Sequence, residues 1–470
     1  MIHRFTIHNT HMVLDVNSGA VHILDDKADG VLSCYDENGT PTENKIEGLV
    51  AEYGHKIVEE ARTELEYLKE KELLFSKDPY EEIFAGRTLP VVVKALCLHI
   101  AHDCNMRCRY CFAGEGDYCG EKSHMSLEVG KKAIDFVTEN SGNRRNLEID
   151  FFGGEPLLNM ETVKGIIEYA GKKENSHNKR FRFTITTNGL LLDDKVMDYV
   201  NGTMDNIVLS IDGRKDINDI MRIRKDGRGS YDAIVPKFQK MAQMRKDKDY
   251  YVRGTFTSNN LDFSKDVLHM AELGFDQISI EPVVLPDGSG MEIREEHLNT
   301  LFMEYEKLAM ELFNLKNKGK EVNFFHFMID PEGGPCVAKR LRGCGSGTEY
   351  LAVTPQGDLF PCHQFVGMPE FLLGDVFYGI NRPGIMETFQ NINVYAKEKC
   401  RNCWAKFYCS GGCAANAWKF HKDLAGCYEI GCELQKRRLE CALWLKAMEM
   451  SEELLSDRFQ TTIDLRKEEG

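Results

Sequence analysis

Apolar strands alternate with amphipathic helices between residues 89 and 334, and this alternation constrains the fold more than any other feature of the sequence. Strands that alternate with helices form parallel sheets with right-handed crossovers. We therefore expect an α/β protein built on a partial (β/α)6 barrel. Its strands are predicted at Val91 to Ala101, Leu147 to Phe152, Phe181 to Thr187, Asn206 to Ile211, Val252 to Phe256 and Gln277 to Val283.

Residues 1 to 88 have a different pattern, with three short strand-like runs and then a helix-periodic segment. We predict strands at Arg4 to Ile7, His11 to Val16 and Ala20 to Leu24, and a helix from about Lys56 to Leu74 with Ile57, Ala61, Leu65 and Leu68 along one stripe. A small sheet with helices suits a separate binding module.

After residue 335 the periodicity weakens while Cys, Gly and aromatic residues become frequent, which indicates a loop-rich domain held by metal. The last residues are charged and lack a strong core pattern, as in a peripheral helix and tail. We predict four parts: a module over 1–88, a barrel over 89–334, a Cys-rich domain over 335–450 and a tail over 451–470.

Charge and hydropathy exclude several classes of protein. A net charge of -15 disfavours a nucleic-acid surface, because phosphate binding needs concentrated Lys and Arg. No run of about 18 apolar residues offers a membrane span. The start of the chain alternates polar and apolar residues, unlike a signal peptide. We expect a cytoplasmic protein with no nucleic-acid or membrane partner.

The chain has 16 cysteines, and in a large cytoplasmic protein metal ligation is a better reading of them than disulfides. Cys104-x3-Cys108-x2-Cys111 follows the first predicted barrel strand. Three thiolates on a 4Fe-4S cluster leave one of its four irons open. S-adenosylmethionine (SAM) can chelate that iron through its amino and carboxylate groups. A structural zinc loop is the alternative.

This motif, with Tyr110 before the third cysteine, resembles the radical SAM superfamily. The resemblance implies that Cys104, Cys108 and Cys111 hold the catalytic cluster. Polar and glycine residues at later strand ends resemble the family's SAM contacts, although they also suit tight turns and helix caps. These residues are Tyr110, Gly153, Gly154, Glu155, Asn188, Ser210 and Asp212.

Two further positions near the predicted strand ends stay open. Relatives carry His-Asp-x-x-Arg where this chain has Asn218 before Arg222, so the pattern assigns no role to Arg222. Glu281, at the end of the last predicted strand, suits either a general base or a hydrogen-bonded structural carboxylate.

The cysteines near the C-terminus are spaced as in the SPASM extension of radical SAM peptide modifiers, which binds two auxiliary 4Fe-4S clusters. The resemblance assigns Cys344, Cys362 and Cys413 to the first cluster, and Cys400, Cys403, Cys409 and Cys432 to the second. Either Cys336 completes the first cluster or the fourth iron of that cluster is open, and Cys427 is the alternative to Cys432. Cys400-x2-Cys403 alone would also suit zinc. We interpret Cys34, Cys97, Cys119 and Cys441 as ordinary thiols.

Taken together, the modules resemble SCIFF maturases, which act on peptides with six cysteines in about forty-five residues, within the thioether-forming ranthipeptide and sactipeptide group. The resemblance implies a winged-helix module that captures a leader peptide by strand addition near Val21 to Leu24. It also implies SAM, three 4Fe-4S clusters, a Cys-rich precursor peptide and a low-potential donor such as flavodoxin or ferredoxin. The alternatives are an anaerobic sulfatase maturase, for which the 88-residue module has little use, and a noncatalytic electron carrier or scaffold.

Overall fold

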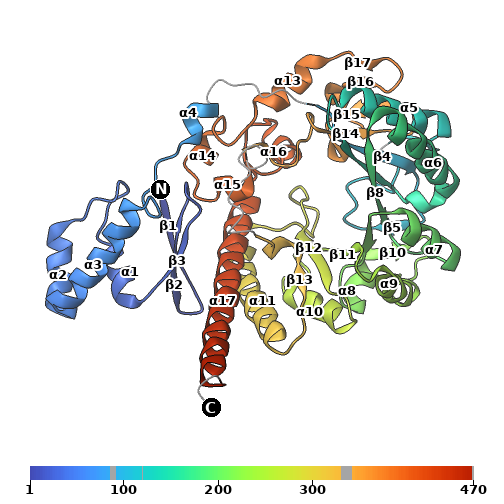
Figure 1. The fold of residues 1–470 in the computed structure, drawn as a ribbon. Coiled ribbons are helices and arrows are strands. Elements are labelled where there is room, and N and C mark those ends of the chain that lie inside the picture. Colours follow the sequence, from blue (N-terminus) through green and yellow to red (C-terminus); the bar gives the residue numbers. More distant parts are fainter. Residues whose placement is uncertain (85–91, 119, 330–340, 468–470) are drawn as a thin grey trace.

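The computed structural model describes residues 1–84, 92–118, 120–329 and 341–467. The chain forms three parts (Figure 1): an N-terminal sheet with helices, a large parallel sheet with helices, and a Cys-rich segment that lies across the top in this view. Helix α17 (Glu429–Lys467) runs between the first two parts. The predicted boundaries at 88/89 and 334/335 lie outside the described residues.

The N-terminal part is an antiparallel three-stranded sheet, ordered β1-β2-β3, with three helices. Its three predicted strands are confirmed. The predicted helix is α3, which ends at Glu70, before a turn in which Glu72 has a positive φ of 55°. Val58, and not Ile57, leads its buried stripe with Ala61 and Leu65. The elements are β1 (Ile2–Ile7), β2 (Thr10–Asp15), β3 (Val21–Leu24), α1 (Asp26–Leu32), α2 (Glu43–Tyr53), α3 (His55–Glu70) and α4 (Tyr80–Phe84).

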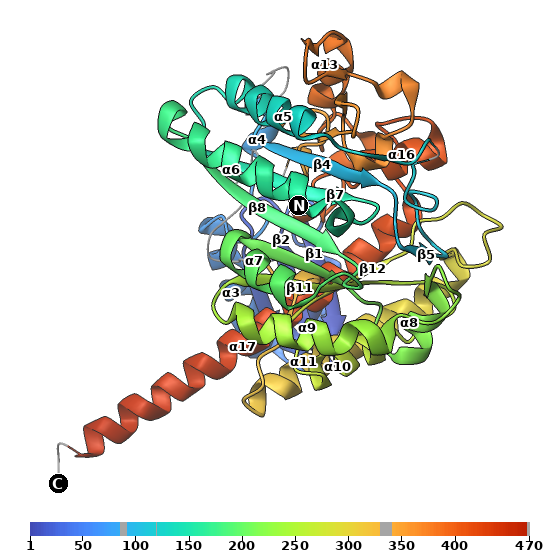
Figure 2. The ribbon, with the colours of Figure 1, turned by 90° about the vertical axis from the view of Figure 1, so that its right-hand side faces the viewer.

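Six parallel strands form the centre of the large sheet, in the order in which they occur along the chain. All six predicted strands are confirmed, and the sheet curves as an open, partial barrel (Figure 2). The short strand β13 (Asn323–Phe324) extends it beyond β12. The six are β4 (Ala95–His102), β7 (Asn146–Gly153), β8 (Arg180–Thr187), β9 (Asn206–Ser210), β11 (Asp249–Phe256) and β12 (Gln277–Pro282).

Helices between these strands cover one side of the sheet (Figure 2), which keeps the carboxyl ends of the strands together at one edge. Side-chain caps begin two of them: Ser126 accepts from the Val129 N–H, and Asp193 accepts from the Val196 N–H. The helices are α5 (Leu127–Asn140), α6 (Met160–His177), α7 (Asp194–Thr203), α8 (Lys215–Met221), α9 (Tyr231–Arg245), α10 (Ser264–Glu272) and α11 (Leu298–Asn317).

The Cys-rich segment continues the barrel sheet. Strand β14 (Tyr350–Val353) pairs in parallel with β4, and three short antiparallel strands follow it. None of these four strands was predicted from the sequence. The remaining elements are β15 (Asp358–Phe360), β16 (Gly374–Asp375), β17 (Gly379–Ile380), α13 (Pro383–Asn391), α14 (Glu398–Arg401), α15 (Lys406–Cys409) and α16 (Ala414–His421).

Helix α17 fastens the N-terminal sheet to the rest of the chain. The His3 imidazole bonds to Glu440 on this helix at 2.9 Å and stacks on Trp404 with ring centroids 3.7 Å apart. The Trp444 indole donates to Thr10 at 3.3 Å. The helix passes the predicted boundary at 450/451 without a break. Within the described residues, no helix has both the length and the apolar content needed to cross a membrane.

Candidate active site

The first cysteine group lies in the connection after β4. The short strand β5 (Met106–Cys108) pairs antiparallel with β10 (Arg222–Arg224) and holds this connection over the sheet edge. Burial, together with the nearby Glu155 carboxylate and the thiols of Cys108 and Cys111, raises the pKa of the Cys104 thiol to about 12. The structure therefore brings the three predicted ligands together, and a cation bound among them would stabilise their thiolate forms.

Two glycines after β7 let this connection lie directly against the strand end. A Cβ on Gly153, whose φ is +118°, would stand 2.4 Å from the Ala101 carbonyl oxygen. A Cβ on Gly154 would stand 2.1 Å from the carbonyl oxygen of Asp103, the residue before Cys104. Only glycine permits such an approach. The pair therefore sets the position of the cysteine loop.

Glu155 joins the ends of two strands beside Cys104. Its carboxylate accepts from the Thr187 hydroxyl and the Asn188 N–H, both at 2.8 Å, and from the Leu157 N–H at 3.1 Å. Burial raises its pKa to about 7. The Asn188 side chain donates to the Cys104 sulfur at 3.6 Å. These contacts place both predicted SAM-binding residues next to the cysteine loop.

A buried network of three side chains lies on the other side of the loop. The Tyr110 hydroxyl donates to the Asp212 carboxylate at 2.8 Å, and Arg222 donates to Tyr110 at 3.0 Å. Burial raises the pKa of Asp212, and the charge of Arg222, 3.8 Å away, opposes this effect. Ser210 is half-buried at the end of β9. Asn218, where relatives carry histidine, accepts from the Asp212 N–H at 3.3 Å.

Arg222 is the residue to which sequence reasoning gave no role. It is 8% exposed, and its Nε has no hydrogen-bond partner among the described residues. Burial raises the pKa values of the Cys108 and Cys111 thiols, and the charge of Arg222 opposes this effect. A buried guanidinium with a free donor beside two thiols provides a binding site for a carboxylate. The signal for it in the sequence was the Asp-x-x-Arg spacing, despite the changed histidine.

Glu281 is held in an ion pair. Arg253 donates to its carboxylate at 2.6 Å. Burial acts to raise the pKa of Glu281, but the charges of Arg253 and His326 outweigh it and hold the pKa at about 2. These contacts fit the structural carboxylate among the two alternatives.

The C-terminal cysteines fall into two groups. Burial raises the pKa values of Cys362 and Cys344. The neighbouring thiols of Cys344 and Cys413 add to this rise at Cys362, and Cys413 adds to it at Cys344. The second group contains five thiols: Cys400, Cys403, Cys409, Cys427 and Cys432.

The two groups contain the residues assigned to the two clusters, and the second group contains Cys427 in addition; the ligand sets themselves stay a prediction. The sulfur atoms of Cys400 and Cys427 lie 3.6 Å apart. Cys336 lies outside the described residues. No set of three or more His, Cys, Asp or Glu side chains in the described ranges stands in the arrangement of a single-ion site. The residue types nevertheless fit iron-sulfur ligation, which uses thiolates.

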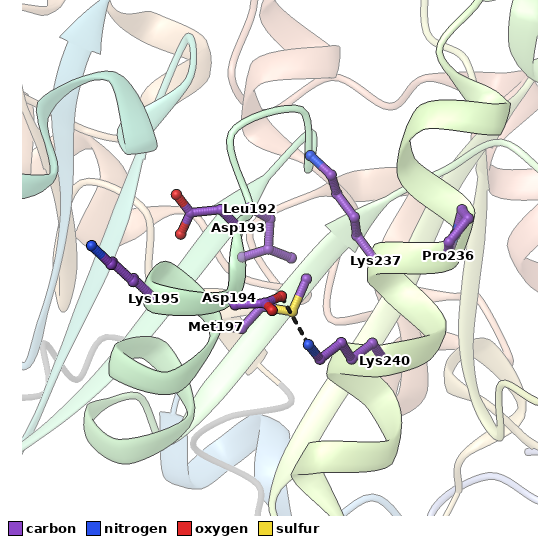
Figure 3. Close-up of a pocket in the computed structure, with 8 residues that line it drawn as sticks. All are labelled: Leu192, Asp193, Asp194, Lys195, Met197, Pro236, Lys237 and Lys240. Atoms are coloured by element: carbon purple, nitrogen blue, oxygen red, sulfur yellow. Dashed lines mark hydrogen bonds and ion pairs between the residues drawn. The ribbon is translucent and has the colours of Figure 1, made fainter.

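A surface pocket between α7 and α9 lies outside this site (Figure 3). Lys240 and Asp194 form an ion pair at 2.8 Å across it, and Lys237 donates to the Leu190 carbonyl. Its lining contains none of the predicted site residues.

Residues 98–257 match the family model described as the Radical SAM superfamily. This segment of the chain therefore belongs to the radical SAM superfamily. The match implies SAM and a 4Fe-4S cluster as the cofactors of this segment. Residues 391–424 also match a model described as MYND finger, which overlaps the cysteines from Cys400 to Cys413.

Two curated proteins illustrate the sequence similarity. An uncharacterized protein of Methanocaldococcus jannaschii is 33% identical over 138 residues, which is 29% of this chain and 45% of that protein, so the chain spans less than half of this relative's length. The radical SAM cyclopropyl synthase TigE of Paramaledivibacter caminithermalis is 22% identical over 432 residues, covering 86% of this chain and 84% of that protein.

Solved structures of two related enzymes share the fold. A chain described as native anSMEcpe with bound AdoMet has a TM-score of 0.62 at 20% identity and covers 77% of this chain and 100% of its own. SuiB from Streptococcus suis, bound to S-adenosylmethionine, has a TM-score of 0.52 at 15% identity, covering 88% of this chain and 95% of its own. The α/β radical SAM fold predicted from the sequence is therefore confirmed.

Proposed function

We propose that this enzyme installs thioether crosslinks in a ribosomally made, Cys-rich precursor peptide. The observation that carries the proposal is the combination of one cysteine loop beside buried Glu155 and Arg222 with a separate N-terminal sheet that has a free strand edge. The first supports SAM cleavage, and the second supports capture of a peptide.

The residues near the cysteine loop fit the chemistry of SAM. Cys104, Cys108 and Cys111 would hold the cluster, which with SAM bound supplies a 5′-deoxyadenosyl radical. The buried carboxylate of Glu155 suits an ammonium group, and the Arg222 guanidinium suits a carboxylate. Asp212 and Tyr110 hold Arg222 in place. The glycine pair and Asn188 fix the loop, and Ser210 lies at the next strand end.

The two C-terminal thiol groups would hold auxiliary 4Fe-4S clusters, with Cys344, Cys362 and Cys413 in the first and Cys400, Cys403, Cys409 and Cys432 in the second. Electrons would enter from a flavodoxin or ferredoxin. Zinc in the second group is the competing occupant, because Cys400-x2-Cys403 suits it. Elemental analysis of protein reconstituted without air separates the two: zinc at one per chain would contradict the second cluster.

The N-terminal sheet would bind the leader of the precursor peptide. Strand β3 pairs only with β2, so its other edge has no strand partner in the described chain. Ile23 on this strand is 47% exposed. An extended peptide can add to such an edge through main-chain hydrogen bonds. A solved SuiB structure with bound precursor peptide SuiA, which matches 89% of this chain, supports this assignment.

Formylglycine formation, as in an anaerobic sulfatase maturase, is the second candidate. The likeness to anSMEcpe and to the cysteine-type anaerobic sulfatase-maturating enzyme of Clostridium novyi favours it. The two reactions leave different products, because a crosslink retains the cysteine sulfur and formylglycine does not.

The test combines SAM, a strong reductant and a Cys-rich precursor peptide with the anaerobically reconstituted enzyme. We expect 5′-deoxyadenosine, and a peptide that loses two hydrogens per crosslink by mass spectrometry and keeps all of its sulfur. Cys104→Ala should abolish 5′-deoxyadenosine formation. If Cys104→Ala still cleaves SAM, the assignment of Cys104 to the SAM site is wrong. A peptide product that has lost a cysteine sulfur would favour formylglycine formation.

A further inference from the structure

Five aromatic side chains form a closed circuit of ring contacts beside the cysteine loop. Consecutive centroids lie between 4.5 and 6.2 Å apart, and the last ring contacts the first. The members come from β4, from β7, from the segment after Cys111 and from the residue after Cys362. In order, this ring circuit is Phe152, His363, Phe112, Tyr118 and His99.

Each polar member of the ring circuit has a buried atom without a hydrogen-bond partner among the described residues. These atoms are His99 Nε2, the Tyr118 hydroxyl and His363 Nδ1. The His99 side chain is fully buried, and Tyr118 is 7% exposed. Native proteins satisfy nearly all buried polar groups, so three unsatisfied atoms in one cluster require an explanation. A polar group that is not part of the described chain would supply it.

The ring circuit joins the two sets of thiols, because Phe112 directly follows Cys111, His363 directly follows Cys362, and the centroids of these two rings lie 5.4 Å apart. Burial, and then the charges of Cys97, Cys111, Cys104 and Cys362, raise the pKa of Tyr118. Its hydroxyl is therefore close both to the predicted SAM-site ligands and to a predicted auxiliary ligand.

His363 lies at a strand end of the barrel, because its ring centroid is 5.2 Å from that of Phe152, the last residue but one of β7. Burial lowers the pKa of its imidazole, the charges of Arg253 and Lys419 lower it further, and the charge of Glu281 opposes them. Arg253 and Glu281 lie on β11 and β12, the last strands of the barrel. A group bound at the ring circuit would thus lie over the strand ends, where chemistry gathers in such barrels.

We infer that His363 and Tyr118 contact the substrate peptide and hydrogen-bond to polar atoms of the residue whose hydrogen is removed. The inference rests on the proposed function, because it requires a peptide between the two thiol groups. The chemistry of the contact calls for a main-chain amide or a small polar side chain, which can both donate and accept. An ordered water only is the competing occupant.

Substitutions can remove these polar atoms and keep the rings. His363→Phe preserves packing against Phe112 and Phe152 but removes Nδ1. His363→Asn places a polar atom near the position of Nδ1, whereas His363→Gln places one near Nε2. Tyr118→Phe removes only the hydroxyl. Tyr305→Phe is a matched control, because its hydroxyl on α11 is equally buried and unpartnered but lies outside the ring circuit.

The readout is hydrogen transfer from a precursor peptide deuterated at carbon. The fraction of 5′-deoxyadenosine that carries deuterium measures how often the radical takes hydrogen from the peptide, whatever final product forms. Iron content, peptide affinity and peptide-free SAM cleavage are measured for each variant. We expect His363→Phe and Tyr118→Phe to lower the deuterated fraction about tenfold, as for one lost buried hydrogen bond. We expect His363→Asn to restore it and His363→Gln not to.

The other outcomes are distinct. Normal deuterium transfer in His363→Phe and Tyr118→Phe would mean that the unsatisfied atoms hold an ordered water only. Parallel loss of iron or of peptide-free SAM cleavage in both would mean that the ring circuit has a purely structural role. Either result overturns the inference and leaves the proposed function intact. No deuterium transfer in the unaltered enzyme, with 5′-deoxyadenosine still formed, overturns the proposed function and the inference with it.

Discussion

Replacing Gly154 with alanine should slow SAM cleavage about a hundredfold while the fold survives. The added Cβ would stand 2.1 Å from the Asp103 carbonyl oxygen, whereas ordinary contact starts at 3.4 Å. The backbone next to Cys104 must therefore move by roughly 1 Å, and a displacement of this size at a reacting centre can cost about a hundredfold in rate. Crowding of this kind destabilises a protein by about 1 to 3 kcal/mol, which most domains survive.

The assay measures 5′-deoxyadenosine, iron per chain and circular dichroism after reconstitution without air. We expect Gly154→Ala to form 5′-deoxyadenosine about a hundredfold more slowly than the unaltered enzyme, with a similar far-ultraviolet spectrum. Gly171→Ala is the matched control, because Gly171 lies in α6 with no atom within 4 Å of its Cβ position. There alanine should stabilise the helix by about 0.5 to 1 kcal/mol. SAM cleavage by Gly154→Ala within threefold of the unaltered rate would refute the close-approach argument.

Three further changes test other parts of the chain. Arg222→Met should weaken SAM binding by about tenfold or more in calorimetric titration, since it removes a buried cation, and unchanged affinity would exclude Arg222 from the site. Ile23→Asp should weaken leader binding about tenfold without altering peptide-free SAM cleavage, because Ile23 is exposed on the edge strand; equal leader affinity would point to another surface. Asp78→Asn should destabilise the protein by about 3 kcal/mol, because it leaves the 4% exposed Lys406 ammonium without its counter-charge, and adding Lys406→Met should recover most of the loss in thermal unfolding. Burial acts to raise the pKa of Asp78, but Lys406 and the Tyr80 N–H lower this pKa overall. The ion pair therefore stabilises the protein above the ordinary carboxyl pKa, and this stability is lost as the pH falls through the lowered pKa of Asp78. An equal loss of stability at acid pH in the double variant would contradict this assignment.

The barrel strands could be predicted because each has apolar residues in a run or at alternate positions, between helix-periodic segments. The sequence did not predict β14, because this strand has only four residues and follows a glycine-rich segment. Its strand character comes from pairing with β4, far away in sequence. Local propensity carries little information about such a strand. The helix end at Glu70 was also missed, since periodicity continues beyond it to the buried Leu74.

The grouping of the C-terminal thiols came from the family resemblance, because short intervals alone would have put Cys413 with Cys409 and not with the distant Cys344 and Cys362. Spacing could not separate Cys427 from Cys432, which lie close together in the chain and contribute to the same group. Arg222 received no role because its neighbour Asn218 differs from the familiar pattern. The ring circuit could not be predicted from the sequence, because its members come from four separate segments.

The attachment of the N-terminal sheet to α17 has a geometric consequence for a bound precursor. His3 and Thr10 fasten the sheet to the helix whose first turn contains Cys432. A leader held on β3 would then start at a fixed distance from the barrel mouth. The number of residues between the leader and the reacting part of the precursor peptide, more than the local sequence, would then select the positions that react.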